Sequence, residues 1–132
     1  MEKQTLSGLR LLIVEDEFLI AMDVEQLCRD RGAVEALIVG TAAGLAAQTV
    51  VPGAFDAAIL DVMIDGQSTL DFARELRRCG IPFIFATGYS DRSEVFSAFP
   101  GVRVVGKPYS GEELIEAIAA IVGPAGDTAV AV

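Results

Sequence analysis

Four short apolar runs in this chain each lead to a polar residue, and this pattern constrains the fold more than any other feature of the sequence. At their carboxyl ends the runs reach Glu15-Asp16, Asp61, Thr87 and, one glycine later, Lys107. Short continuous apolar runs are typical of strands that are buried on both faces of a parallel sheet. A charged side chain is costly to bury in such a strand, so it belongs at the strand's open end or beside a binding partner.

Helical patterns separate these runs along the chain. Strands are expected at residues 9–14, 34–39, 57–61, 82–86 and 102–105, and helices at 17–31, 41–51, 68–78, 91–99 and 110–122. The apolar stripe expected on the first helix consists of Phe18, Ala21, Met22, Val24, Leu27 and Cys28. Five strand–helix repeats predict an α/β fold with a parallel sheet covered on both faces. Right-handed crossovers then place the carboxyl ends of all strands on one edge.

Composition excludes several classes of protein. A chain of 132 residues with 52% hydrophobic residues fits one domain with its own core. The formal net charge of −9 argues against a nucleic-acid partner and favours a cation or a basic partner. Apolar runs of about 18 residues and a hydrophobic leader are both absent, so we expect a cytoplasmic protein with no membrane contact. Histidine is absent, and Cys28 and Cys79 are expected to be unpaired thiols.

The polar residues expected on the shared edge fit the chemistry of phosphoryl transfer. Glu15, Asp16 and Asp61 bring three carboxylates together, and like charges raise each other's pKa unless a cation lies between them. Oxygen ligands without histidine or cysteine favour Mg²⁺. With a metal ion, the charge of Lys107 and the hydroxyl of Thr87 can neutralise phosphoryl oxygens. Asp61 is then the expected nucleophile for an aspartyl phosphate. Each residue alone has a commoner structural role, so this hypothesis depends on the whole set.

Over roughly residues 9–122, this set resembles the receiver domain of two-component response regulators. The resemblance implies a flavodoxin-like, doubly wound sheet with strand order 2-1-3-4-5. It implies a signalling protein, rather than a conventional enzyme, that receives phosphate from a sensor histidine kinase or a histidine phosphotransfer protein. In the site that it implies, Asp61 is the phosphoacceptor, and Thr87 and Lys107 bind the phosphoryl oxygens. Mg²⁺ is held by Asp16, Asp61 and the Met63 backbone carbonyl, with Glu15 acting through water. The resemblance also implies a cis bond before Pro108.

The run from Phe85 to Tyr89 is similar to a branch of receivers with an F-A-T-G-Y motif, often stand-alone proteins of alphaproteobacteria. The chain lacks the usual Met-Pro after the phosphoacceptor, and Val104 stands where receivers usually carry an aromatic switch residue. We therefore expect Thr87 and Tyr89 to carry the switch. Residues 1–8 and 123–132 are expected to be flexible, and the protein to be a monomer or weak homodimer.

Three alternative functions share this type of fold. Phosphatases that form an aspartyl phosphate usually show Asp-x-Asp, but Met63 stands two residues after Asp61. A nucleotide-binding module needs a glycine-rich or hydroxyl-rich loop after its first strand, where Glu15 and its acidic neighbours would repel phosphate. The remaining alternative is a receiver-like module that binds partners without being phosphorylated.

Overall fold

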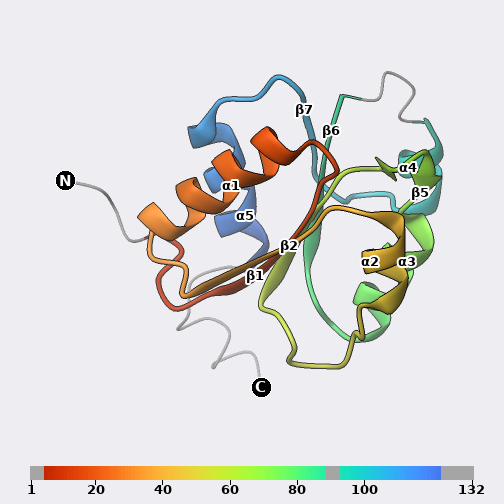
Figure 1. The fold of residues 1–132 in the computed structure, drawn as a ribbon, viewed down its shortest axis with the longest axis horizontal. Coiled ribbons are helices and arrows are strands. Elements are labelled where there is room, and N and C mark those ends of the chain that lie inside the picture. The colour runs from red at the N-terminus through yellow and green to blue at the C-terminus, as the bar shows by residue number, and fades with distance from the viewer. Residues whose placement is uncertain (1–4, 89–92, 123–132) are drawn as a thin grey trace.

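The computed structural model, which describes residues 5–88 and 93–122, contains a five-stranded parallel sheet with helices on both faces (Figure 1). The sheet order is β2-β1-β3-β6-β7, which is 2-1-3-4-5 when these five strands are counted along the chain. The predicted flavodoxin-like topology is therefore confirmed. The strands of this sheet are β1 (Arg10–Val14), β2 (Glu35–Val39), β3 (Ala57–Leu60), β6 (Phe83–Thr87) and β7 (Val104–Gly106).

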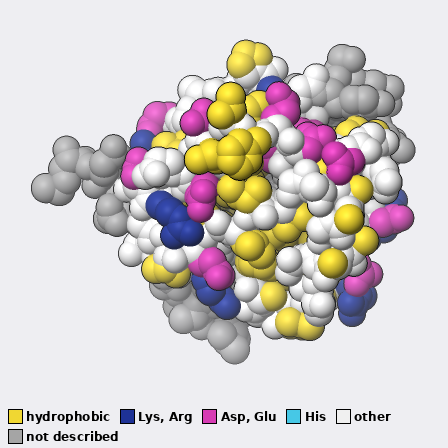
Figure 2. All heavy atoms as spheres, viewed as in Figure 1, with side chains coloured by type: hydrophobic (Ala, Val, Ile, Leu, Met, Phe, Trp, Pro, Cys, Tyr) yellow, Lys and Arg dark blue, Asp and Glu magenta, His cyan; other side chains and the backbone are white. Residues whose placement is uncertain are grey.

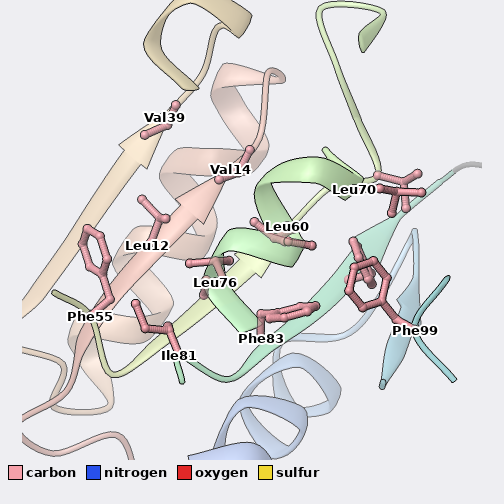
Figure 3. Close-up of a cluster of buried hydrophobic side chains, with 14 of the residues drawn as sticks. Leu12, Val14, Val39, Phe55, Leu60, Leu70, Leu76, Ile81, Phe83 and Phe99 are labelled. Carbon is pink, nitrogen blue, oxygen red and sulfur yellow. The ribbon is translucent and has the colours of Figure 1, made fainter. Parts of the chain in front are cut away.

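Two apolar cores lie on opposite faces of this sheet. Helices α1 and α5 cover one face, and α2, α3 and α4 lie on the other (Figure 1). Figure 3 shows the second core, in which Leu60, Phe83 and Phe99 pack together. All four residues of β3 are buried, which is the expected burial of a central parallel strand. The helices are α1 (Phe18–Asp30), α2 (Ala42–Ala47), α3 (Leu70–Arg78), α4 (Ser93–Ala98) and α5 (Gly111–Val122). Within the described residues, none of them is long and apolar enough to cross a membrane.

The first helix differs from the sequence prediction in the face that it buries. Ala21, Val24 and Cys28 face the core as predicted. Phe18 and Met22 were expected on the same stripe, but their exposed fractions are 69% and 44%. Phe18 lies in the first turn, beside the carboxyl edge of the sheet, and Met22 lies about 100° around the helix from Ala21. Neither position therefore points at the sheet.

Element boundaries and the N-terminal segment also differ in places from the prediction. Helix α2 ends at Ala47 instead of residue 51, because the β-branched residues that follow favour the extended chain seen from Gln48. The last strand begins at Val104, because the N–H of Val102 bonds to the Phe99 carbonyl in a turn. Residues 1–8 were expected to be flexible, but Leu6 is fully buried and belongs to the core under α1 and α5.

A two-stranded hairpin after β3 is absent from the sequence prediction. Its strands are β4 (Met63–Ile64) and β5 (Gln67–Ser68), joined by Asp65 and Gly66. Both joining residues have positive φ angles, of 51° and 75°, which a two-residue hairpin turn of type I′ requires. Asp-Gly is a strong sequence signal for this turn, so the hairpin was predictable from the dipeptide. Because Ser68 pairs with Met63, α3 begins only at Leu70.

Thr69 closes the base of this hairpin. Its side chain is fully buried, and its hydroxyl donates to the carbonyl oxygens of Asp61 at 2.6 Å and Val62 at 3.1 Å. Its own N–H donates to the Val62 carbonyl at 2.9 Å. Thr69 thus supplies hydrogen-bond donors to the backbone carbonyls where β3 passes into the hairpin. These bonds fix the chain that follows Asp61.

Cys28 should resist thiol reagents in the folded protein. Burial raises the pKa of its thiol from 9.0 to about 12, and only the thiolate is nucleophilic. Because the folded pKa lies above the unfolded one, this group's contribution to stability is full below about pH 9 and is lost as the pH rises toward 12. Mass spectrometry after iodoacetamide treatment at pH 8 should find Cys28 unmodified until urea unfolds the chain. Rapid labelling of Cys28 in the folded protein would contradict its burial.

Thr69→Val should destabilise the fold by about 1–3 kcal/mol, because it leaves a buried carbonyl at Asp61 without its hydroxyl donor. Urea unfolding monitored by circular dichroism measures the change. Thr49→Val makes the same substitution at an exposed position and should change stability by less than about 0.5 kcal/mol. Equal stabilities for the two variants would show that the Thr69 hydroxyl does not support the hairpin.

Candidate functional site

The carboxyl edge of the sheet gathers one cation and several carboxylates. Lys107 follows β7, and its Nζ lies 2.5 Å from Oε1 of Glu15 and 2.8 Å from Oδ2 of Asp61. Glu15 follows β1 and Asp61 follows β3, so a single ammonium joins the ends of three strands. Glu17 lies farther out, with its Oε1 3.7 Å from the same nitrogen. The strand order predicted this meeting, since β1 and β3 are neighbours and both run parallel to β7.

Burial strengthens the electrostatic interactions among the charged side chains of this cluster. Glu15 and Asp61 have exposed fractions of only 5% and 9%. Burial raises the pKa of Glu15, and its hydrogen bonds with Lys107 and the Glu17 N–H oppose that change. For Lys107, burial alone would lower the pKa, but hydrogen bonds to Asp61 and Glu15 outweigh it and raise the pKa above the ordinary lysine value. Lys107 therefore remains an ammonium ion at neutral pH.

The same edge carries oxygen ligands of the kind that bind a hard cation. Glu15, Asp16 and Asp61 each offer an oxygen, and the three oxygens lie within 4.8 Å of one another. Asp16 is exposed to solvent, whereas Lys107 pairs with Glu15 and Asp61. Carboxylate oxygens with open access to water suit Mg²⁺, which retains several water ligands when it binds to proteins. The residues present thus fit a magnesium ion.

The other predicted site residues lie at or near this edge. The Thr87 carbonyl at the end of β6 accepts a hydrogen bond from the Lys107 N–H at 2.9 Å, and the Thr87 side chain is buried. Met63 begins the hairpin, and its N–H lies 3.4 Å from Oδ1 of Asp61. The Lys107–Pro108 bond is cis. Val104 is half-buried and packs against the α3–α4 core, while Tyr89 lies outside the described residues.

A groove beside the site was not predicted. Its volume is about 570 Å³, and it lies between α1 and the start of α5, bordered by Lys107 and Tyr109. Next to it, Phe18 and Leu19 in the first turn of α1 are 69% and 76% exposed. Figure 2 shows hydrophobic side chains gathered over the start of α1 and over the edge strand β2. Periodicity alone predicts that Phe18 is in the core and does not distinguish Leu19, because it does not show where a helix extends past its sheet.

The hairpin residues Asp65 and Thr69 were also missed as parts of the site. The Asp65 N–H donates to Oδ2 of Asp16 at 2.9 Å, and Thr69 holds the carbonyl of Asp61. The Asp-Gly dipeptide would have placed the turn at Asp65, but nothing in the local sequence pairs this turn with Asp16. That contact depends on β1 and β3 lying side by side.

Comparisons with known proteins agree on one family. Residues 11–119 match the family described as "Response regulator receiver domain". Nodulation protein W of Bradyrhizobium diazoefficiens is 32% identical over 114 residues, which cover 83% of this chain and 49% of that protein. The chain therefore spans about half the length of this curated relative.

Solved structures give the same result. The response regulator PhyR from Brucella abortus has a TM-score of 0.73 and 25% identity, covering 97% of this chain and 54% of that one. The response regulator TrrA from Thermotoga maritima, solved in complex with Mg²⁺–BeF, has a TM-score of 0.66 and 25% identity, covering 81% of this chain and 93% of that one. Because the family match runs from β1 into α5 and so takes in the whole five-stranded sheet, this chain belongs to the response regulator receiver family.

Proposed function

We propose that this chain is the phosphoacceptor of a two-component or phosphorelay system and that Asp61 receives the phosphoryl group. The position of Asp61 carries this proposal: it follows the central strand, and its carboxylate lies 2.8 Å from the ammonium of Lys107. Asp61 follows β3 at the carboxyl edge of the sheet, so a donor would approach its carboxylate from that edge. The donor is a phosphohistidine of a sensor histidine kinase or a histidine phosphotransfer protein.

In the proposed reaction, a carboxylate oxygen of Asp61 attacks the phosphorus atom of the donor. A new O–P bond forms, the N–P bond to the imidazole breaks, and its electron pair stays on the ring nitrogen. The Lys107 ammonium then bonds to a phosphoryl oxygen, and the Thr87 hydroxyl donates to another. Hydrogen bonds that hold the pKa of Lys107 above its ordinary value keep this charge in place. The chain thus signals by modification of its own carboxylate, and it acts on no other substrate.

Mg²⁺ is the proposed cofactor of this site. Asp16, Asp61 and the Met63 carbonyl would hold it directly, with Glu15 acting through water. When bound, the metal supplies positive charge to the phosphoryl oxygens. Two observations support this assignment: the three carboxylate oxygens lie within 4.8 Å of one another, and the Thermotoga maritima neighbour was solved with Mg²⁺–BeF.

The surface beside Asp61 supports a protein partner. Phe18 and Leu19 offer exposed apolar contacts, and the groove between α1 and α5 adjoins Lys107. Glu17 and Asp23 line the same groove, which suits a partner with basic side chains. We propose that the donor docks over α1 and this groove, where its phosphohistidine can reach Asp61.

The output of the phosphorylated form is also proposed. Movement of Thr87 toward Asp61 would carry Gly88 and Tyr89 with it, whereas Val104 is stiff at χ1 and unsuited to an aromatic rotamer switch. The phosphorylated chain then either binds a target protein or removes phosphate from a shared kinase. We place this activity in the cytoplasm, where such kinases present their phosphohistidine.

Acetyl phosphate with Mg²⁺ should add one phosphoryl group to the wild-type protein, and Asp61→Asn should abolish that addition. The amide is a poor nucleophile and keeps the shape of the side chain. Intact-mass spectrometry measures the added group, and omission of Mg²⁺ should prevent it.

Asp71→Asn is the matched control, because Asp71 is an exposed aspartate in the first turn of α3 whose carboxylate pairs with Arg74. It should be labelled as fast as the wild type. Full labelling of Asp61→Asn would refute Asp61 as the acceptor. A wild-type protein that stays unlabelled would favour the alternative of a receiver-like module that binds partners without phosphorylation.

A further inference from the structure

We propose that Asp65, at the tip of the β4–β5 hairpin, is a positioning residue for the cation site. This inference rests on the proposed function, because it assumes that Asp16 binds Mg²⁺. The Asp65 N–H donates to Oδ2 of Asp16 at 2.9 Å, and Oδ2 of Asp65 accepts from the N–H of Ala42 at 2.8 Å. Asp65 therefore connects the carboxylate after β1 to the first residue of α2.

Asp16 depends on this contact for its orientation. Its side chain is exposed, and within residues 5–88 and 93–122 the Asp65 N–H is its one hydrogen-bond donor. An exposed carboxylate without a fixed donor rotates among several conformations, and ordering it on binding costs entropy. With one oxygen held by Asp65, the other oxygen of Asp16 remains available to a cation. Outer-sphere contacts of this kind commonly orient the groups that bind a metal directly.

The conformation of Asp65 explains why its side chain matters. Its φ angle of 51° lies in the left-handed region, which aspartate and asparagine enter more readily than most residues. The hairpin that it caps has only two residues in each strand, so the strand pairing contributes just two residue pairs to holding the tip. The bond from Ala42 to the Asp65 carboxylate adds a tether to a separate element. Without that tether, the N–H that orients Asp16 is free to move with the tip.

The same tether reaches a second proposed ligand. Met63 is the first residue of β4, and its backbone carbonyl is the proposed non-carboxylate ligand of Mg²⁺. Thr69 fixes the base of the hairpin through Asp61 and Val62, while Asp65 fixes its tip through Asp16 and Ala42. Met63 lies between these two attachments. The hairpin thus holds two of the ligand groups in register with Asp61.

Two substitutions separate positioning from charge. Asp65→Gly keeps the left-handed backbone without strain but removes the bond to Ala42. Asp65→Asn keeps both the backbone and the acceptor oxygen but removes the negative charge. If Asp65 acts only by attracting cations, both variants weaken Mg²⁺ binding equally. If it acts by position, only the glycine variant does.

Isothermal titration calorimetry of the full chain with Mg²⁺ alone is the direct test. We expect Asp65→Gly to raise the dissociation constant about tenfold, as is common when an outer-sphere partner of a metal ligand is lost. Asp65→Asn should bind Mg²⁺ with nearly wild-type affinity. Thr41→Ala is the control, because it removes a different bond at the start of α2, from the Gly44 N–H to the Thr41 hydroxyl, and leaves Asp65 in place. It should also bind like the wild type.

A metal-free readout accompanies the titration. In the wild type, the amide of residue 65 should exchange slowly with solvent for an exposed turn, because its N–H is bonded to Asp16. In Asp65→Gly that protection should fall, and in Asp65→Asn it should remain. This measurement needs neither Mg²⁺ nor phosphorylation.

Three results would overturn the inference. They are wild-type Mg²⁺ affinity in Asp65→Gly, equal weakening in Asp65→Asn, and equal weakening in Thr41→Ala. In each case the wild type binds Mg²⁺ and Asp61 can still be labelled, so the proposed function stands. A wild-type protein that binds no Mg²⁺ and accepts no phosphate would overturn the proposed function and this inference together.

Discussion

The ion pairs of Lys107 are the interaction on which the carboxyl edge of this protein depends. Its ammonium lies between Glu15 and Asp61, two side chains that are almost fully buried. Two carboxylates in this position would repel each other strongly without a cation between them. Loss of one partner from a buried ion pair leaves an uncompensated charge, which destabilises proteins by several kcal/mol. The positive charge of Lys107 therefore balances the charges of the two carboxylates, and any group that binds Asp61 has to preserve that balance.

The two apolar cores supply the rigidity that this balance requires. β3 is buried along its whole length, and the Asp61 N–H bonds to the Val14 carbonyl, so the backbone at the acidic edge is fixed by the sheet. Two phenylalanines of β6, Phe83 and Phe85, pack with Phe99, which follows α4, and the ring centroids lie 5.5–5.7 Å apart. Phe83 meets each of the other two rings edge-to-face. A rigid sheet with functional groups on its end loops is a common arrangement for binding and catalysis. Here the loops after β1, β3 and β7 carry the charges, and the loop after β3 is folded into a hairpin of its own.

Much of this arrangement could be predicted from the sequence because it follows from local patterns. The apolar runs identify the buried strands, the strand–helix alternation identifies a parallel sheet, and right-handed crossovers then bring Glu15, Asp61 and Lys107 to one edge. The resemblance to receivers added the strand order. The errors arose where local pattern and three-dimensional surroundings diverge. Phe18 and Met22 fit a helical apolar period, yet no part of the sheet lies beneath them. The Asp-Gly dipeptide signals the turn at Asp65 and Gly66, but the pattern-based prediction of strands and helices lacks the hairpin.

The residues that are buried as strands, and the polar groups that end these strands, can be identified from the sequence, because hydrophobic period and strand direction are properties of consecutive residues. The expectation that Cys28 and Cys79 are unpaired agrees with their positions in the structure, in the cores on opposite faces of the sheet. The pairing of the charges and the contacts that hold the hairpin, in contrast, depend on the three-dimensional packing of the strands. The bond from Asp65 to Asp16 spans 49 positions in the chain, and the bond from Lys107 to Glu15 spans 92. Contacts between such distant residues depend on the relative positions of neighbouring strands, which no local pattern encodes.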